Sequence, residues 1–274
     1  MRLFLMHTMK LLAFLLLFSS CASFSGMGVG RVKRYTIDSD RLPASFDGAQ
    51  IAFISDLHYP SLFTAERLQK LVRKVRKLSP DALVMGGDYT PGEEYLDTLF
   101  SPFSSLEIPC GIYAVAGNHD KRRKAAVAAS MERAGIIFLA DSCGLLTKNG
   151  EQLCVAGVGN SMAVEDGALA MLSALPDSLF TILLAHAPDF AQDAQVAVDL
   201  VLSGHTHGGQ VSLFRLYTPV KNTKYGTRFL TGLNRTSKGV PVITTNGVGT
   251  SRRKLRFCAP SEIVLVRLRK SRRK

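Results

Sequence analysis

The sequence predicts an α/β fold in which two β-sheets pack together with helices on their outer faces. Three observations lead to this prediction. Apolar, often β-branched runs alternate with amphipathic helical stretches over the first two thirds of the chain. The last third contains strand-like runs joined by loops rich in glycine and threonine. The chain has 274 residues, of which 46% are hydrophobic, and this is enough for a sizeable core.

The first half of the chain shows the strand–helix alternation most clearly. The stretch at 64–79 places apolar residues at helical spacing opposite a basic face, and Thr64 is a suitable N-cap. In chain order we expect strands at 50–55, 81–87, 111–117 and 136–140, and helices at 64–79, 93–103 and after Asp120.

The second half is richer in strands. Here we expect strands at 152–159, 180–185, 198–204, 209–214, 240–245 and 262–268, and one helix at 166–175. No internal repeat and no convincing linker interrupts the pattern, so one domain is the better interpretation.

The first 24 residues are expected to be a targeting segment rather than part of the folded domain. Basic residues precede an apolar run at 11–18, and small residues follow it. This order is typical of a secretory signal, and the run is shorter than the roughly 20 residues of a membrane span. Cys21 resembles a bacterial lipoprotein acylation site; cleavage near Ala22 and an uncleaved anchor are the alternatives. We therefore expect export to the bacterial cell envelope and association with its membrane.

Charge and cysteine content bound the function only weakly. The formal net charge is +12, but residues 251–274 hold ten Lys or Arg against one acid, so most of the excess lies there. The high pI therefore does not make the folded domain a nucleic-acid binder. Cysteines at 110, 143, 154 and 258 form no C-x-x-C pair, so neither a zinc finger nor a disulfide framework is expected.

Polar clusters follow five of the expected strands, and they hold five of the six histidines. The clusters are ISDLH (Asp56, His58), GGDY (Asp88), AGNHD (Asn118, His119, Asp120), LLAHAP (His186) and LSGHTHGG (His205, His207). In open α/β sheets, ligand sites form at the carboxyl ends of the strands, so these clusters are expected to converge on one crevice.

The residue types in these clusters suit a pair of divalent metal ions. Carboxylate, amide oxygen and imidazole ligands fit Mn, Fe or Zn, and the clusters offer no thiolate. Seven candidate ligands exceed the needs of one tetrahedral ion, whereas two ions bridged by a shared carboxylate account for them. A single Asp-x-His pair at a strand end is more often part of a turn in which the side chains are locally satisfied. The combination of all five clusters is what makes the prediction specific.

In their order and spelling, these five clusters resemble the signature motifs of the calcineurin-like metallophosphoesterases. Segments 42–63 and 244–268 further resemble a membrane-associated bacterial subgroup described as YaeI-like or YkuE-like. The resemblance implies a four-layer α/β/β/α sandwich of two mixed β-sheets flanked by helices. It also implies one catalytic domain at 42–268, followed by a basic tail at 269–274.

The resemblance further implies roles for the individual residues. Carried over by position, Asp56, His58 and His207 would hold the first ion; Asn118, His186 and His205 would hold the second; and Asp88 would bridge them. A metal-bridging hydroxide would then attack phosphorus while His119 protonates the leaving oxygen. Asp120 would orient the His119 imidazole.

The chain departs from the subgroup in the residues around these motifs. Four cations, Lys121–Lys124, follow GNHD, and Arg122 and Arg123 are candidates for contacts with a substrate phosphate. Asn246 stands where the family usually has arginine, and the usual twin-arginine export signal is missing.

The predicted function is that of an exported, membrane-associated, dinuclear-metal phosphoesterase acting on a phosphorylated substrate. A short anchor and the basic C-terminal segment would together hold it on an anionic membrane. A lipid-linked substrate such as UDP-2,3-diacylglucosamine ranks first among specific substrates. The alternatives are a nuclease or nucleotide phosphodiesterase and, without catalysis, a metal-stabilised membrane-surface binding protein. Nucleic acid is the weaker partner because the basic residues lack interleaved aromatics.

Overall fold

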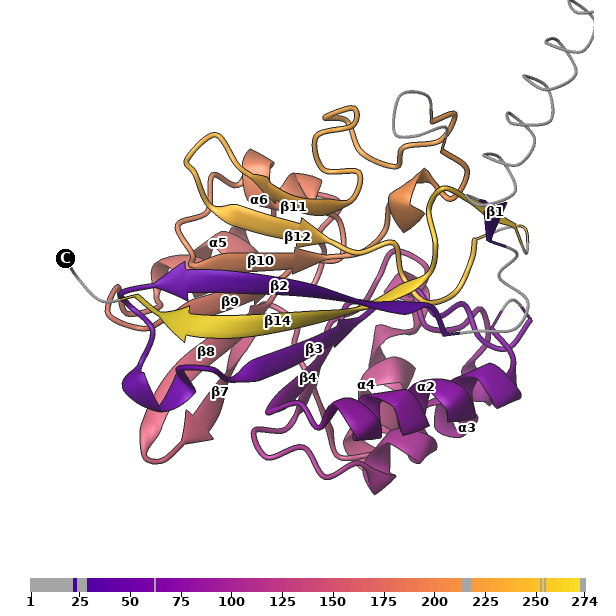
Figure 1. Ribbon diagram of the computed structural model, residues 1–274, viewed down its shortest axis with the longest axis horizontal. Helices are drawn as coiled ribbons and strands as arrows, with labels where there is room; N and C mark the ends of the chain where they lie inside the picture. Colours follow the sequence, from indigo (N-terminus) through magenta and orange to yellow (C-terminus); the bar gives the residue numbers. More distant parts are fainter. Residues whose placement is uncertain are drawn as a thin grey trace, which may run out of the picture.

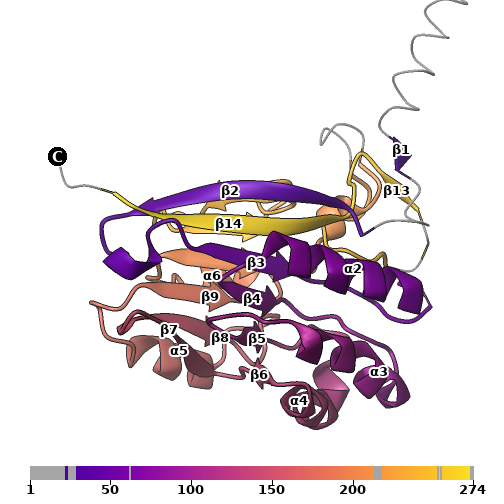
Figure 2. The ribbon, with the colours of Figure 1, turned by 60° about the horizontal axis from the view of Figure 1, so that its bottom comes forward.

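The computed structural model describes residues 22–23, 29–61, 63–212, 218–251, 253 and 255–271. It contains two six-stranded mixed β-sheets with helices on their outer faces (Figures 1 and 2). This confirms the predicted fold class. The expected signal segment at 1–24 lies outside the described residues apart from Ala22 and Ser23, and so do the last three residues of the expected tail, 272–274.

The first sheet contains the first and the last strand of the two six-stranded sheets. Its order is β2 (Arg31–Ser39), β14 (Glu262–Lys270), β3 (Gln50–Ile54), β4 (Ala82–Met85), β5 (Ile112–Ala114) and β6 (Ile136–Phe138). Strands β3 to β6 are parallel, while β14 runs antiparallel to β3 and parallel to β2. Strand β2 was not predicted because it is an edge strand in which four of the nine residues are charged and Ile37 alone is buried.

The second sheet has a parallel centre with an antiparallel strand at each edge. Its order is β11 (Gly232–Arg235), β12 (Pro241–Thr244), β10 (Leu200–Ser203), β9 (Thr181–Leu184), β8 (Glu151–Gly157) and β7 (Ser142–Lys148). The edge strands β7 and β11 were not predicted, whereas all four central strands were. A separate short pair joins β1 (Ala22–Ser23) to β13 (Arg256–Phe257).

Helices cover the outer faces of both sheets (Figure 2). The first sheet packs against α2 (Ala65–Leu78), α3 (Leu96–Phe100) and α4 (Lys124–Arg133), and the second against α5 (Asp166–Ser173) and α6 (Asp189–Asp193). Thr64 caps α2 as predicted, because its hydroxyl accepts a hydrogen bond from the Arg67 amide. The predicted helix at 93–103 is broken into the 3₁₀ turn Glu93–Tyr95, α3 and the 3₁₀ turn Ser101–Ser105.

Side-chain alternation along the strands creates the layers. In β3, Ile51 and Phe53 face the second sheet, while Ala52 and Ile54 pack toward the helices. Strand β9 repeats this pattern: Ile182 and Leu184 join the core between the sheets, and Leu183 joins the outer layer. The central strands are therefore buried on both faces, and polar side chains emerge only where these strands end. No helix among the described residues is long and apolar enough to cross a bilayer.

Candidate metal centre

The polar clusters predicted from the sequence meet at one edge of the two sheets. Asp56 and His58 follow β3, Asp88 follows β4, and Asn118 and His119 follow β5. From the second sheet, His186 follows β9, and His205 and His207 follow β10. Both sheets thus contribute to one site, as the strand-end argument predicts.

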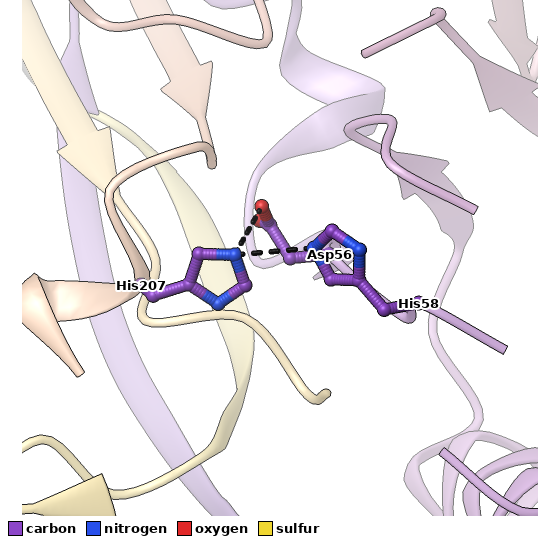
Figure 3. A group of neighbouring side chains, drawn as sticks. All are labelled: Asp56, His58 and His207. Atoms are coloured by element: carbon purple, nitrogen blue, oxygen red, sulfur yellow. Dashed lines mark hydrogen bonds and ion pairs between the residues drawn. The ribbon is translucent and has the colours of Figure 1, made fainter. Parts of the chain in front are cut away.

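Three of these residues form the first group of possible metal ligands. The donor atoms of Asp56, His58 and His207 all lie within 4.8 Å of one another. The Nε2 atom of His207 lies 3.2 Å from Nε2 of His58 and 3.3 Å from Oδ1 of Asp56 (Figure 3). Two imidazoles and one carboxylate therefore point at a common position.

A second group lies beside the first. It consists of Asp88, His186 and His205, whose donor atoms are also within 4.8 Å of one another. The Nε2 atom of His186 is 3.3 Å from Oδ2 of Asp88 and 3.2 Å from Oδ1 of Asn118. The same Oδ2 of Asp88 is 3.7 Å from Nε2 of His58, so this carboxylate reaches both groups.

The donor set fits two divalent cations. Nitrogen and oxygen atoms from buried or half-buried side chains converge, and lone pairs at such short separations are best satisfied by a cation between them. Each group contributes one carboxylate and two imidazoles, the ligand types of Mn, Fe and Zn. The structure supports two candidate ion positions and does not choose among these metals.

The electrostatic environment keeps three of the histidines neutral. Burial lowers the pKa of His58 and of His205 to about 4, and that of His207 falls well below its usual value for the same reason. Neutral imidazole is the form that binds a metal, so these rings need lose no proton at neutral pH.

His186 and the two carboxylates behave differently. Burial disfavours the charged form of His186, but the neighbouring Asp88 carboxylate raises the pKa of this histidine to about 10. Burial acts against the charge of Asp88 too, yet the surrounding histidines, His186 first, hold its pKa well below its ordinary value. Burial raises the pKa of Asp56 to about 6.

The backbone at the site is strained. Five of the candidate ligands have positive φ angles: 58° at Asp56, 51° at His58, 58° at Asp88, 68° at His205 and 53° at His207. Left-handed conformations at residues other than glycine cost of order 1–3 kcal/mol each, and they cluster at functional sites. The surrounding fold must therefore hold these turns in place.

Two glycines allow the turns to approach each other closely. A Cβ atom at Gly117 would lie 2.1 Å from Oδ1 of Asp88, and one at Gly204 would lie 2.3 Å from Oδ2 of Asp56. Any larger residue at either position would displace a carboxylate of the site. These contacts explain the glycines that flank the predicted ligands.

The hydrogen bonds of Asp120 differ from those predicted. Its carboxylate is fully buried and accepts hydrogen bonds from the amides of Asp88 (2.8 Å), Gly117 (2.8 Å) and Tyr89 (3.1 Å). Those amides, and not the ring of His119, are its partners. Because it carries its charge away from solvent and near Asp88, its pKa is raised to about 6. Asp120 therefore joins the turn after β4 to the turn after β5.

His119 lies at the open side of the site. Its side chain is 57% exposed, and its Nε2 atom is 4.0 Å from Oδ2 of Asp88. Its backbone amide donates a hydrogen bond of 2.9 Å to Oδ1 of Asp88. The ring thus stands next to both groups without belonging to either.

The four cations after the GNHD cluster lie beside the site. Lys121–Arg123 form a 3₁₀ turn, and α4 begins at Lys124. The Arg123 guanidinium donates to the carbonyl oxygens of Thr90 (2.9 Å) and His119 (2.8 Å), so it fastens the His119 loop. None of the four is among the described residues that line the pocket over the metal centre. Arg123 therefore has a structural role in this loop, and its predicted contact with a substrate phosphate stays a prediction.

The predicted strand at 209–214 is wrong over its described part. Residues His207–Gly209 form a 3₁₀ turn, and Val211 makes only an isolated bridge to Phe257; residues 213–217 lie outside the described chain. Gly208 and Gly209 both have positive φ, which this turn requires and a regular strand excludes.

Sequence reasoning missed Arg256, which it placed in an exposed basic segment. Its side chain is fully buried. The guanidinium donates to the carbonyl oxygens of His207 (3.0 Å), Ala259 (2.9 Å), Asn246 (2.6 Å) and Gly249 (3.1 Å). It therefore binds the turn that carries His207 to the turn at 246–249. The sequence signal that could have shown this was the apolar setting Leu-Arg-Phe inside an otherwise basic run.

A pocket of about 590 Å³ opens over the metal centre. It is lined by candidate ligands and His119. Its lining also includes an apolar wall of Val211, Pro219, Val220 and Leu255, together with the polar side chains of Gln210 and Arg253. The site can therefore take a ligand that has an anionic centre and an apolar part.

Comparison with known proteins agrees with this geometry. The model of the calcineurin-like phosphoesterase family matches residues 49–209. The chain is 32% identical over 242 residues to the uncharacterized metallophosphoesterase YkuE of Bacillus subtilis, covering 86% of this chain and 84% of that protein. It is 28% identical over 213 residues to the phosphodiesterase YaeI of Escherichia coli, covering 73% and 75%. It is also 29% identical over 262 residues to a transmembrane protein with a metallophosphoesterase domain of Danio rerio, covering 86% and 56%.

Proposed function

This chain belongs to the calcineurin-like phosphoesterase family, and from that premise we propose that it hydrolyses phosphodiester or pyrophosphate bonds of a lipid-linked substrate at a membrane surface, using two divalent metal ions. The observation that carries the reaction is the pair of three-residue groups under one pocket, with Asp88 within reach of both. The chain is a hydrolase of the metallophosphoesterase type. The lipid-linked substrate and the membrane location are our proposal.

The first ion would be held by Asp56, His58 and His207, and the second by His186, His205 and Asn118, with Asp88 shared. When bound, two such ions lower the pKa of a water molecule and neutralise phosphoryl oxygens. The protein's part is to fix the ligand geometry through its strained turns and to exclude competing water from the buried side of the site.

We infer that His119 acts as the general acid. It lines the pocket, is half exposed, and is held by its amide against Asp88, so its ring can reach an oxygen that leaves toward the pocket. A proton delivered there in the transition state typically contributes about 10²–10⁴-fold to the rate.

The test is to replace His119 with alanine in the metal-loaded full chain. We expect turnover of bis(p-nitrophenyl) phosphate to fall by about 10²-fold or more, while the metal content measured by elemental analysis stays near that of the wild type. Lys121→Ala, at an exposed neighbouring position that does not line the pocket, is the control. An active His119→Ala protein would remove His119 from the mechanism, and an inactive metal-replete wild type would refute the proposed activity.

The proposal of a lipid-linked substrate rests on the apolar wall of the pocket. Val211, Val220 and Leu255 are 38%, 52% and 40% exposed, so apolar surface borders the metal centre directly. This composition favours an acyl-bearing substrate such as UDP-2,3-diacylglucosamine over a nucleic acid.

The proposal of membrane association rests on where the amino-terminal end of the described chain lies. Strand β1, which follows the apolar segment at 11–18, pairs with β13 next to Leu255 (Figure 2). An anchor preceding β1 would therefore hold the mouth of the pocket near the bilayer, within reach of lipid-borne substrate. A relative of this chain is named a transmembrane protein, which agrees with such a location.

A further inference from the structure

A second cavity adjoins the metal centre. Its volume is about 280 Å³, and it shares two wall residues, His205 and Asn222, with the larger pocket. His205 belongs to the second group of metal ligands, so the small cavity borders that group.

The wall between the cavities is fixed by hydrogen bonds. The Asn222 side-chain amide donates to the carbonyl oxygen of His205 at 3.3 Å. Farther along the same loop, the hydroxyl of Thr223 and the amide of Lys224 donate to the Asp189 carboxylate at the start of α6. The loop at 218–224 is therefore tied at the metal centre and at α6, so the small cavity is a built feature of the fold.

The chemistry of the small cavity differs from that of the metal centre. Met162, Ala163 and Phe190 supply an apolar surface. Its two carboxylates are already engaged: Asp189 by Thr223 and Lys224, and Asp193 by the Lys224 ammonium at 2.5 Å. This ion pair also neutralises the one lysine that lines the cavity. The cavity thus suits an uncharged organic group rather than a second anion.

We infer that the small cavity binds the non-leaving arm of the substrate, and that the protein is built for phosphorus carrying two organic substituents. The inference rests on the proposed function. A phosphate monoester has one arm and would leave the small cavity empty, whereas a diester or a diesterified pyrophosphate has two and fills both cavities.

The position of His119 indicates which arm of the substrate leaves and which stays on phosphorus. His119 lines the large pocket but is not among the residues of the small cavity. In the hydrolysis, the oxygen of water forms a bond to phosphorus, and the bond between phosphorus and the leaving oxygen breaks. The leaving oxygen takes up a proton. The arm in the large pocket therefore departs, and the arm in the small cavity stays on the product as its phosphate monoester.

The test obstructs the small cavity without touching a ligand. Ala163→Trp places a large side chain at an exposed position on its wall. In the metal-loaded full chain, kcat/KM for bis(p-nitrophenyl) phosphate is expected to fall by about tenfold or more, which corresponds to about 1.4 kcal/mol. For p-nitrophenyl phosphate, whose single arm occupies the large pocket, kcat/KM is expected to change by less than about twofold.

Ala197→Trp is the matched control, because Ala197 is also exposed but lines a different cavity. Met162→Trp provides a second obstruction if Ala163→Trp does not fold. A selective loss of the diester reaction supports the inference. An equal loss with both substrates, or no loss with either, overturns it. A wild type that hydrolyses neither substrate contradicts the proposed function itself, so the two failures are distinguishable.

Discussion

Replacing Asp120 with alanine should destabilise the fold at the metal centre. The carboxylate accepts hydrogen bonds from three buried amides, those of Asp88, Tyr89 and Gly117. Each buried donor left without a partner costs about 1–3 kcal/mol, so the three together should lower the free energy of unfolding by about 3 kcal/mol or more. For a domain of this size, that corresponds to a decrease in Tm of roughly 6–12 °C.

The assay is thermal and urea unfolding of the full chain in the presence of a chelator, so that bound metal does not contribute. Asp177→Ala, at an exposed aspartate, is the matched control and should change stability little. Mn²⁺ affinity should also fall for Asp120→Ala, because Asp88 loses the support of its turn. Unchanged stability and unchanged Mn²⁺ affinity would refute the role of Asp120 as the link between the two turns.

The pH dependence of this destabilisation has a definite sign. The pKa of Asp120 is raised to about 6 in the folded protein, so the wild type binds an extra proton relative to the unfolded chain between the ordinary value, 3.8, and about 6. Proton binding by Asp120 therefore adds to the free energy of unfolding. This contribution is fully present below pH 3.8 and is lost as the pH rises through 6. The difference between wild type and Asp120→Ala should therefore be larger at pH 5 than at pH 7.5.

Two further predictions concern metal and membrane binding. Because Asp88 raises the pKa of His186 to about 10, Mn²⁺ binding at pH 7.5 should release a proton from this ring. Calorimetry in two buffers of different ionisation enthalpy should detect the release, and equal enthalpies would contradict it. Of the cations after Leu268, Arg269 already pairs with Asp38, so the triple replacement of Arg272, Arg273 and Lys274 with alanine should weaken binding of the full chain to anionic vesicles. At about 1 kcal/mol per cation, the three replacements together should weaken binding by about 100- to 200-fold, with neutral vesicles as the control; unchanged binding to anionic vesicles would show that the tail does not contribute.

The central parts of the fold could be predicted from the sequence, and its edges could not. Strands buried on both faces, such as β3 and β9, are continuous apolar runs and can be recognised from the sequence. Edge strands such as β2 and β7 have one solvated face, and their polar and charged residues resemble those of a loop. Their pairing depends on partners far away in the sequence, which local periodicity does not encode.

The candidate metal ligands could be predicted from the sequence, but the residues that hold their turns in place could not. The ligand types and their position after strands were enough to gather Asp56, Asp88 and the histidines. Asp120 and Arg256 received other roles, because sequence spacing cannot show which backbone groups surround a buried charge. Arg256 lies 49 residues from His207 in the chain, and only the folded structure shows that its guanidinium supports the His207 turn.

The position of β14 has a consequence for how the chain folds. This strand pairs with β2 from Glu262 opposite Arg31 to Lys270 opposite Ser39, and on its other side it pairs with β3. The first two strands of this sheet in sequence are therefore joined only by the last one. During synthesis, this sheet cannot be completed until the chain has been made as far as Lys270. Any truncation before β14 would leave β2 without its neighbour, and the nascent chain must remain incompletely folded until its final strand is available.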